Sequence, residues 1–110
     1  MKKADLEYFW YVLSEWSQAT FGPDKERGPV GPLEHLAKEV KEALDCPSDM
    51  MEYVDLLFLT FDAARRAGFT YDQLLEWTWK KMEINKLRKW PKPTSDEPVE
   101  HIREEDLPRW

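Results

Sequence analysis

One acidic segment constrains the fold most, because residues 38–55 have the sequence K-E-V-K-E-A-L-D-C-P-S-D-M-M-E-Y-V-D, with two acidic pairs around a chain reversal. The members of each pair are three residues apart, and residues with that spacing are neighbours on a helix surface. The pairs are Glu39 with Glu42 and Glu52 with Asp55. Pro47 lies between them and cannot continue a helix. The segment therefore predicts two antiparallel helices that direct four carboxylates at one gap.

Four carboxylates that face one gap repel one another unless a cation lies among them. Hard oxygen ligands of this kind suit Mg²⁺ or Mn²⁺. The spacing therefore predicts a metal site formed by Glu39, Glu42, Glu52 and Asp55. Two structural uses compete with this interpretation. Glu39 and Glu42 also suit a solvated helix face, and Glu52 has capping-box spacing from Asp49.

Asp55 has the most restrictive surroundings, because it lies in the sequence Y-V-D-L-L-F-L-T-F, which is apolar around nearly the whole helix. A helix of that kind is predicted to be buried. A buried carboxylate requires an ion pair, hydrogen bonds or a metal. A metal would bind Asp55 together with the other three acids. The alternative is a structural ion pair of Asp55 with a Lys or Arg.

The composition excludes several classes of partner. With 110 residues the chain suits one domain with a single core. Its net charge of −6 opposes non-specific binding to DNA or RNA, although a metal can bridge acids to a phosphorylated ligand. No apolar run is long enough for a membrane span, and no secretory signal is visible, so we expect a cytoplasmic protein. The single Cys46 excludes an internal disulfide.

Helical periodicity and end signals predict an all-α fold. The four expected helices cover about residues 5–20, 32–45, 49–67 and 70–90. The end signals are an N-cap at Asp5, Pro32 in a first helical position, and a capping box of Thr70 with Gln73. Pro91 ends the last helix. We therefore expect a helical domain over residues 1–91 and an extended, Pro-rich and charged tail over residues 92–110.

The loop of residues 21–32 contains three Gly and three Pro, which exclude regular structure. A loop of this length suits either a function or a plain connection. It carries Lys25 and Arg27, which are candidates to close over a polyphosphate. Trp16, close to this loop, is a candidate to stack on a base, although aromatic stripes of this kind more often form a core.

One face of the last predicted helix carries hydrogen-bond donors. Lys81, Asn85 and Arg88 recur at i, i+4 and i+7, as a phosphate clamp requires. The alternative is a solvated face. Arg65 and Arg66 lie in the last turn of the third predicted helix, where positive charge suits the helix dipole.

Taken together, these stretches resemble the MazG-like all-α nucleoside triphosphate pyrophosphohydrolases. Their acidic signature, E-E-x-x-E followed by E-x-x-D, corresponds here to K-E-x-x-E and E-x-x-D. The chain is more similar to a phage-associated, MazZ-like branch described as dATP/dGTP diphosphohydrolases. The similar stretches are W-S-x-x-T-F-G-P, R-G-P-V-G-P-L-x-H-L-x-K-E, D-A-x-R-R-A-G and N-K-x-R-x-W-P, within about residues 13–105.

The resemblance implies four helices per subunit, assembled as a homodimer or homotetramer. It implies Mg²⁺ on the four acids named above, and Lys81, Asn85 and Arg88 on the triphosphate. Lys38 departs from the family, which has a glutamate at this position. One carboxylate is therefore missing, which leaves open the number of metal ions and the residue that activates water.

From these features we expect a Mg²⁺-dependent enzyme that converts dATP or dGTP into the monophosphate and pyrophosphate. Glu39 or Glu42 would take the proton of the attacking water. The expected setting is the cytoplasm of a bacterium or of a phage-infected host, and the purine preference rests on the resemblance alone. The alternatives are a pyrimidine dCTP or dUTP pyrophosphatase with the same acidic hairpin, and a non-catalytic helical interaction module.

Overall fold

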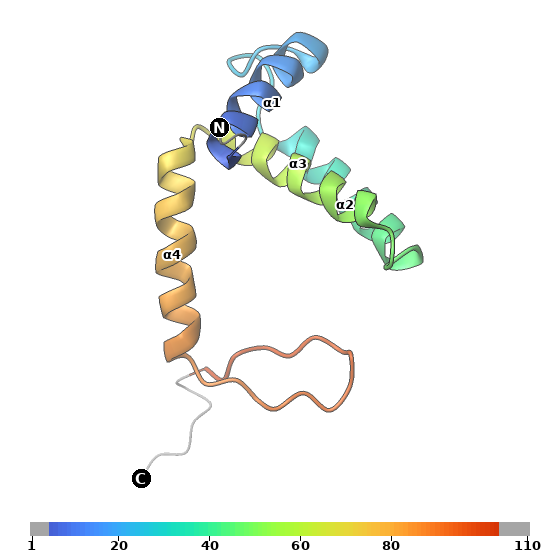
Figure 1. Ribbon diagram of the computed structural model, residues 1–110, viewed down its shortest axis with the longest axis vertical. Coiled ribbons are helices and arrows are strands. Elements are labelled where there is room, and N and C mark those ends of the chain that lie inside the picture. The colour runs from blue at the N-terminus through green and yellow to red at the C-terminus, as the bar shows by residue number, and fades with distance from the viewer. Residues whose placement is uncertain (1–4, 104–110) are drawn as a thin grey trace. The chain divides into compact units, whose positions relative to one another are not determined.

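The computed structural model describes residues 5–103. In this range four helices follow one another: α1 (Leu6–Phe21), α2 (Val30–Asp45), α3 (Met50–Arg66) and α4 (Tyr71–Leu87) (Figure 1). No β-strand occurs between residues 5 and 103, although an isolated antiparallel β-bridge joins Lys89 to Ile102. The all-α, four-helix prediction is therefore confirmed.

Side-chain caps fix two of the helix beginnings as the sequence predicted. The Tyr8 N–H donates to Asp5 Oδ1 at 3.0 Å, so Asp5 caps α1. At α4 the capping box is reciprocal. The Thr70 N–H donates to Gln73 Oε1 at 2.9 Å, and the Gln73 N–H donates to Thr70 Oγ1 at 3.1 Å. Each cap satisfies backbone donors that have no partner inside the helix.

Two other predicted bounds were wrong. Helix α2 begins at Val30, two residues before the predicted Pro32, with Pro29 as its N-cap. Pro32 is tolerated in this first turn because the N–H groups there have no intrahelical acceptor. Helix α4 ends at Leu87 rather than near Trp90. The Trp90 indole N–H instead donates back to the Asn85 carbonyl at 2.8 Å.

Helices α2 and α3 form an antiparallel pair that lies side by side in Figure 1. The turn between them is held at both ends. The Tyr53 hydroxyl donates to the Pro47 carbonyl at 2.7 Å, and Asp49 caps α3 by accepting from the Met51 N–H at 3.0 Å. The predicted reversal at Pro47 is confirmed, and it brings the two acidic pairs onto neighbouring helices.

An aromatic core fixes α1 against α3. Trp10, Leu13 and Phe61 are buried at its centre. The Trp10 and Phe61 ring centroids are 5.3 Å apart, and those of Phe9 and Phe58 are 5.0 Å apart. Tilted pairs of this kind contribute about 0.5–1.5 kcal/mol each beyond the buried area. The core therefore sets the position of α3, which carries two of the four predicted metal ligands, Glu52 and Asp55.

The chain forms two compact units, the first ending at Leu74 and the second beginning at Leu75. The first contains α1, α2, α3 and the beginning of α4. The second contains the rest of α4 and the following segment, in which the ring of Trp90 lies 5.7 Å from that of His101. Residues 92–103 contain no helix, while residues 104–110 of the predicted tail lie outside the described range. The predicted boundary at residue 91 stays a prediction.

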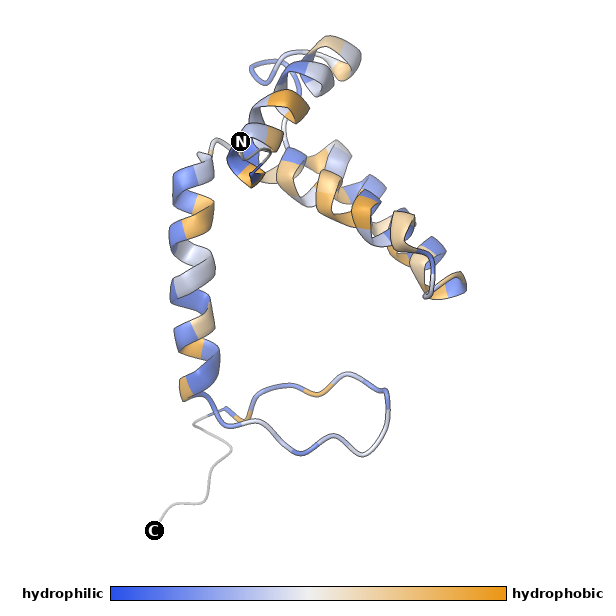
Figure 2. Ribbon diagram, viewed as in Figure 1, coloured by the Kyte–Doolittle hydropathy of each residue, from blue (hydrophilic) through white to orange (hydrophobic). Residues whose placement is uncertain are grey.

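Several large apolar side chains of the α2–α3 pair remain exposed. They are Val30, Leu33, Val40, Leu44, Met50, Met51, Tyr53 and Leu57. Figure 2 shows the corresponding orange bands along both helices. Within the first unit these side chains are not covered by another element, and clustered exposed apolar side chains are typical of a contact surface. Within residues 5–103, no helix has the length and apolar character needed to cross a membrane.

Candidate metal centre and adjoining pocket

Three carboxylates meet between α2 and α3. One oxygen each of Glu39, Glu52 and Asp55 lies within 4.8 Å of the other two. Glu39 comes from α2, while Glu52 and Asp55 are one turn apart on α3. All three side chains are half-buried. We call this set the acidic group, and it is three of the four acids whose spacing predicted a common gap.

Glu42, the fourth predicted ligand, is exposed and lies outside the acidic group. Its carboxylate is close enough to raise the pKa values of two members of the group. The neighbouring Glu42 carboxylate raises the pKa of Glu39, and partial burial raises it further. Burial is the main cause that raises the pKa of Glu52, and the Glu42 charge adds to it. The folded chain therefore disfavours full ionisation of these acids when no cation balances them.

Two carboxylate oxygens of the acidic group have no donor. Glu39 Oε2 and Glu52 Oε2 are both buried and lack a hydrogen-bond partner among the described residues. The other Glu39 oxygen, Oε1, contacts His35 Nε2 at 3.1 Å. A buried oxygen without a donor is costly. Carboxylate oxygens are the ligands that Mg²⁺ and Mn²⁺ prefer, so this donor set fits a divalent cation.

The structural alternatives predicted for Glu52 and Asp55 are not seen among the described residues. Asp49 caps α3 with its own carboxylate, and the predicted reciprocal contact from the Glu52 side chain is absent from the described residues, so Glu52 stays available to the acidic group. Asp55 is half-buried rather than fully buried as predicted. It has no ion pair with a Lys or Arg within residues 5–103.

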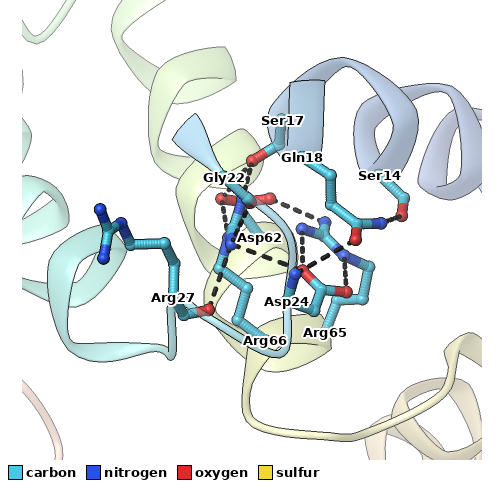
Figure 3. Close-up of polar contacts among 9 residues, drawn as sticks. All are labelled: Ser14, Ser17, Gln18, Gly22, Asp24, Arg27, Asp62, Arg65 and Arg66. Carbon is cyan, nitrogen blue, oxygen red and sulfur yellow. Dashed lines mark hydrogen bonds and ion pairs between the residues drawn. The ribbon is translucent and has the colours of Figure 1, made fainter. Parts of the chain in front are cut away.

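A different aspartate forms the buried ion pair. Asp62, two turns further along α3, accepts hydrogen bonds on both carboxylate oxygens (Figure 3). Oδ1 accepts from Arg65 Nη1 at 2.7 Å. Oδ2 accepts from Ser17 Oγ at 2.8 Å and from Arg66 Nε at 3.2 Å. Asp62 was not among the predicted site residues, although arginines three and four positions after an aspartate are a recognisable helical pairing.

The two arginines fix the loop between α1 and α2, so the role predicted for them at the helix dipole was incomplete. The Arg66 side chain is only 1% exposed. Its Nη1 donates to the Gly22 carbonyl at 3.0 Å and the Arg27 carbonyl at 3.1 Å. Arg65 binds the Asp24 carboxylate through Nε and Nη2, at 3.1 and 3.0 Å. Both arginines thus hold residues of a loop that contains no regular structure of its own.

Gly22 is required where this loop leaves α1. Its φ of +112° lies in a region that other residues rarely adopt. An added Cβ would also lie 3.0 Å from Arg27 Cγ. The Arg27 stem therefore packs directly over the Gly22 backbone, while its guanidinium points away from the arginine network in Figure 3.

A pocket of about 340 Å³ adjoins the acidic group within the first unit. Four of its lining residues are apolar, namely Phe21, Val30, Pro32 and Leu59. Its other lining residues are Arg27, Gly28, Gly31, His35, Asp62 and Arg66. Trp16 does not line it, but its ring meets that of Phe21 edge-on at 5.5 Å. Of the predicted nucleotide-binding residues, Arg27 is therefore in the pocket wall and Trp16 is behind it.

The predicted phosphate clamp belongs to the second unit. Lys81 is exposed, while Asn85 and Arg88 are half-buried on α4. Asn85 Oδ1 is a further buried acceptor with no partner in the described range. Contact of these three residues with a triphosphate stays a prediction, as do the catalytic roles of Glu39 and Glu42. Lys38, the departure from the family pattern, is exposed on α2.

Comparison with known proteins identifies the family to which this chain belongs. The family of dATP/dGTP pyrophosphohydrolases matches residues 11–107. The Eaa protein of Salmonella phage P22 is 48% identical over 92 residues, which are 84% of this chain. The chain spans only 28% of that relative's length.

A solved structure shares the fold. It is the cyanophage S-2L MazG-like pyrophosphohydrolase, bound to dGDP and three catalytic Mn²⁺ ions per active site. The TM-score is 0.72 with 24% sequence identity, and the match covers 91% of this chain and 99% of that one. At this identity the likeness shows a common MazG-like fold.

Proposed function

Because the chain belongs to the dATP/dGTP pyrophosphohydrolase family, we propose that it hydrolyses dATP or dGTP between the α and β phosphates. The products are the deoxynucleoside monophosphate and pyrophosphate. The acidic group carries this proposal, since two of its buried oxygens, on Glu39 and Glu52, have no donor within the described residues. A purely structural cluster would have its buried oxygens paired.

Glu39, Glu52 and Asp55 would hold Mg²⁺ or Mn²⁺, with Glu42 beside them. When bound, such an ion polarises a phosphate and lowers the pKa of an attacking water. His35 contributes by holding Glu39 Oε1, while the buried Glu39 Oε2 has no donor among the described residues. Contacts of this kind orient a ligating carboxylate.

Of the two predicted proton acceptors, Glu42 fits better than Glu39. Glu39 is engaged by His35 and by the acidic group. Glu42 is exposed next to it and lies outside that group. A general base must be within hydrogen-bond reach of the water and free to take its proton. We therefore assign the base to Glu42 and the ligand role to Glu39.

The substrate assignment is tested by measuring pyrophosphate release from each of the four dNTPs and from dUTP, with Mg²⁺, with Mn²⁺ and with EDTA. We expect release from dATP and dGTP with either metal and none in EDTA. Faster release from dCTP or dUTP would favour the pyrimidine alternative. No release from any nucleotide would leave a non-catalytic interaction module.

We also propose that the active form is a homodimer or homotetramer. The exposed apolar side chains of α2 and α3 support this, because no other element of the first unit covers them. Light scattering at micromolar concentration tests it, and full activity in a monomer would contradict it.

A further inference from the structure

We infer that the pocket beside the acidic group receives the purine base of the substrate, and that Arg27 donates a hydrogen bond to the purine N7. The inference rests on the proposed function, because it supplies the place for the base once the triphosphate is at the acidic group. It goes further by naming the wall that recognises the base and the atom that is recognised.

The position of the pocket follows from the antiparallel pairing of α2 and α3. His35 lines the pocket and lies four residues before Glu39 of the acidic group. Leu59 lines it and lies four residues after Asp55. Four residues correspond to about 6 Å along a helix. On both helices the pocket therefore begins one turn from the acids. The sugar of a nucleotide can span this distance, with the base in the pocket and the phosphates at the acids.

The size and surface of the pocket suit a single flat ring system. Its volume of about 340 Å³ lies at the lower end of the roughly 300–1,000 Å³ of small-molecule sites. Phe21, Pro32 and Leu59 give it apolar walls, one of which is an aromatic ring. Every base has a π-face that stacks on such a ring. A charged triphosphate, by contrast, would lose its hydration among these side chains.

The polar side chains in the pocket wall differ in whether their hydrogen-bonding groups already have partners. Asp62 and Arg66 also line the pocket, but they are occupied by the network that holds the loop. The Arg27 carbonyl is occupied too, since it accepts from Arg66. The Arg27 guanidinium forms no hydrogen bond or ion pair within residues 5–103. Arg27 is therefore the cation in this wall whose donors remain available.

Arginine donors match the acceptors on one edge of a purine. They pair with N7 and O6 of guanine, and N7 is present in adenine but has no counterpart in a pyrimidine ring. An arginine at the pocket wall therefore favours both purines through one shared atom. Arg66 fixes the backbone from which the Arg27 side chain extends, by binding the carbonyls of Gly22 and Arg27, so this backbone is in place before the ligand arrives.

The decisive probes are deoxyguanosine and 7-deaza-deoxyguanosine, which differ only in the N7 position. Neither carries phosphate, so binding is measured by calorimetry in EDTA and is independent of the metal. We expect the wild type to bind deoxyguanosine about tenfold or more tightly than the 7-deaza compound, as for a hydrogen bond to a charged donor. Arg27→Met should remove this preference. Lys25→Met, the same change in an exposed cation of the same loop, should retain it.

A second variant tests the pocket without touching a charge. Gly31 lines the pocket, and an added Cβ there meets nothing within 4 Å. Gly31→Leu therefore fills space, and it replaces a poor helix former in α2. We expect affinity for deoxyguanosine to fall by about tenfold or more, with the melting temperature maintained. Ala37→Leu, at an exposed position of α2 outside the pocket lining, should bind as the wild type does.

Equal binding of the two nucleosides by the wild type would overturn the role of Arg27. Unchanged deoxyguanosine affinity in Gly31→Leu would overturn the pocket itself. Neither result bears on pyrophosphate release, which tests the proposed function. Conversely, if no dNTP is hydrolysed but both nucleoside results are as expected, the pocket is supported and the hydrolase assignment fails.

Discussion

Two aspartates of α3 occupy opposite kinds of surroundings although they are only seven residues apart. Asp62 has both oxygens bound by donors from Ser17, Arg65 and Arg66. Asp55 faces two other carboxylates, Glu39 and Glu52, whose buried oxygens lack donors within the described range. Both oxygens of Asp62 therefore have hydrogen-bond donors, whereas two oxygens of the acidic group have none among the described residues. If the acidic group holds a metal as proposed, the number of unpaired acceptors, more than burial, separates a structural acid from a ligand site.

The largest effect that we expect comes from Asp62→Asn. This change removes the carboxylate that binds Arg66 Nε and leaves the buried guanidinium only the longer contact with Asp24, at 3.5 Å, which costs about 3–5 kcal/mol of unfolding free energy. Urea unfolding in EDTA, followed by far-UV circular dichroism, measures the loss. A loss no greater than the roughly 0.5 kcal/mol of an ordinary surface substitution would show that the network is not needed.

The matched change Asp55→Asn should have the opposite sign in EDTA. It removes one of several mutually repelling carboxylates, so the metal-free protein should be as stable as the wild type or more stable. With Mg²⁺ the order should reverse. A ligand that binds only the folded state stabilises it by about 2.7 kcal/mol at a hundredfold excess over its Kd, and Asp55→Asn should lose much of that gain together with turnover.

Thermal unfolding of both proteins with and without Mg²⁺ gives the measurement. The result against us would be a strong destabilisation of Asp55→Asn in EDTA combined with a wild type that ignores Mg²⁺. Asp55 would then be a structural acid like Asp62, and the contrast between the two sites would disappear.

The features that the sequence predicted correctly are local. Acids at a spacing of three, Pro47 between the pairs, and the Thr70 and Gln73 cap each depend on neighbours within one or two turns. These signals were enough to predict the helical pair and the meeting of Glu39, Glu52 and Asp55. The same spacing predicted Glu42 in this group, but Glu42 lies outside it. Three-residue spacing fixes a common helix face only approximately.

The features that were missed depend on partners distant in the chain. Asp62 is paired with Ser17, which lies 45 residues earlier, and Arg66 with carbonyls 39 and 44 residues earlier. Periodicity cannot identify such partners. The same limit led to the expectation of complete burial for Asp55, because an apolar run says nothing about which side of the helix a neighbour covers.

The criterion of unpaired acceptors can be extended to the second unit. Asn85 Oδ1 is buried without a partner among the described residues, and Lys81 precedes it by one turn. If both contact the triphosphate, Lys81→Ala and Asn85→Ala should each weaken dATP binding by about 1.5–3 kcal/mol with the fold intact. Lys80→Ala, at an exposed neighbouring position, is the control. Unchanged dATP affinity in both variants would mean that this helix face is only solvated and does not contact the triphosphate.

The smallest expected effect is a pH dependence confined to the metal-free acidic group. Burial raises the pKa of Glu52 above its ordinary value of 4.5, and the neighbouring Glu42 carboxylate together with burial raises that of Glu39. The folded state therefore holds these protons more tightly than the unfolded state. Their contribution to stability is present below pH 4.5 and is lost as the pH rises through the raised pKa values.

Glu52→Gln isolates this contribution, because glutamine cannot ionise. In EDTA at pH 7 the variant should be slightly more stable than the wild type, and the advantage should shrink as the pH falls towards 4.5 and the wild-type carboxyls gain protons. Urea midpoints at several pH values measure it, with Glu34→Gln on the exposed face of α2 as the control. An advantage that stays constant with pH would mean that Glu52 bears no unbalanced charge, and its unpaired oxygen would then be no evidence for a cation.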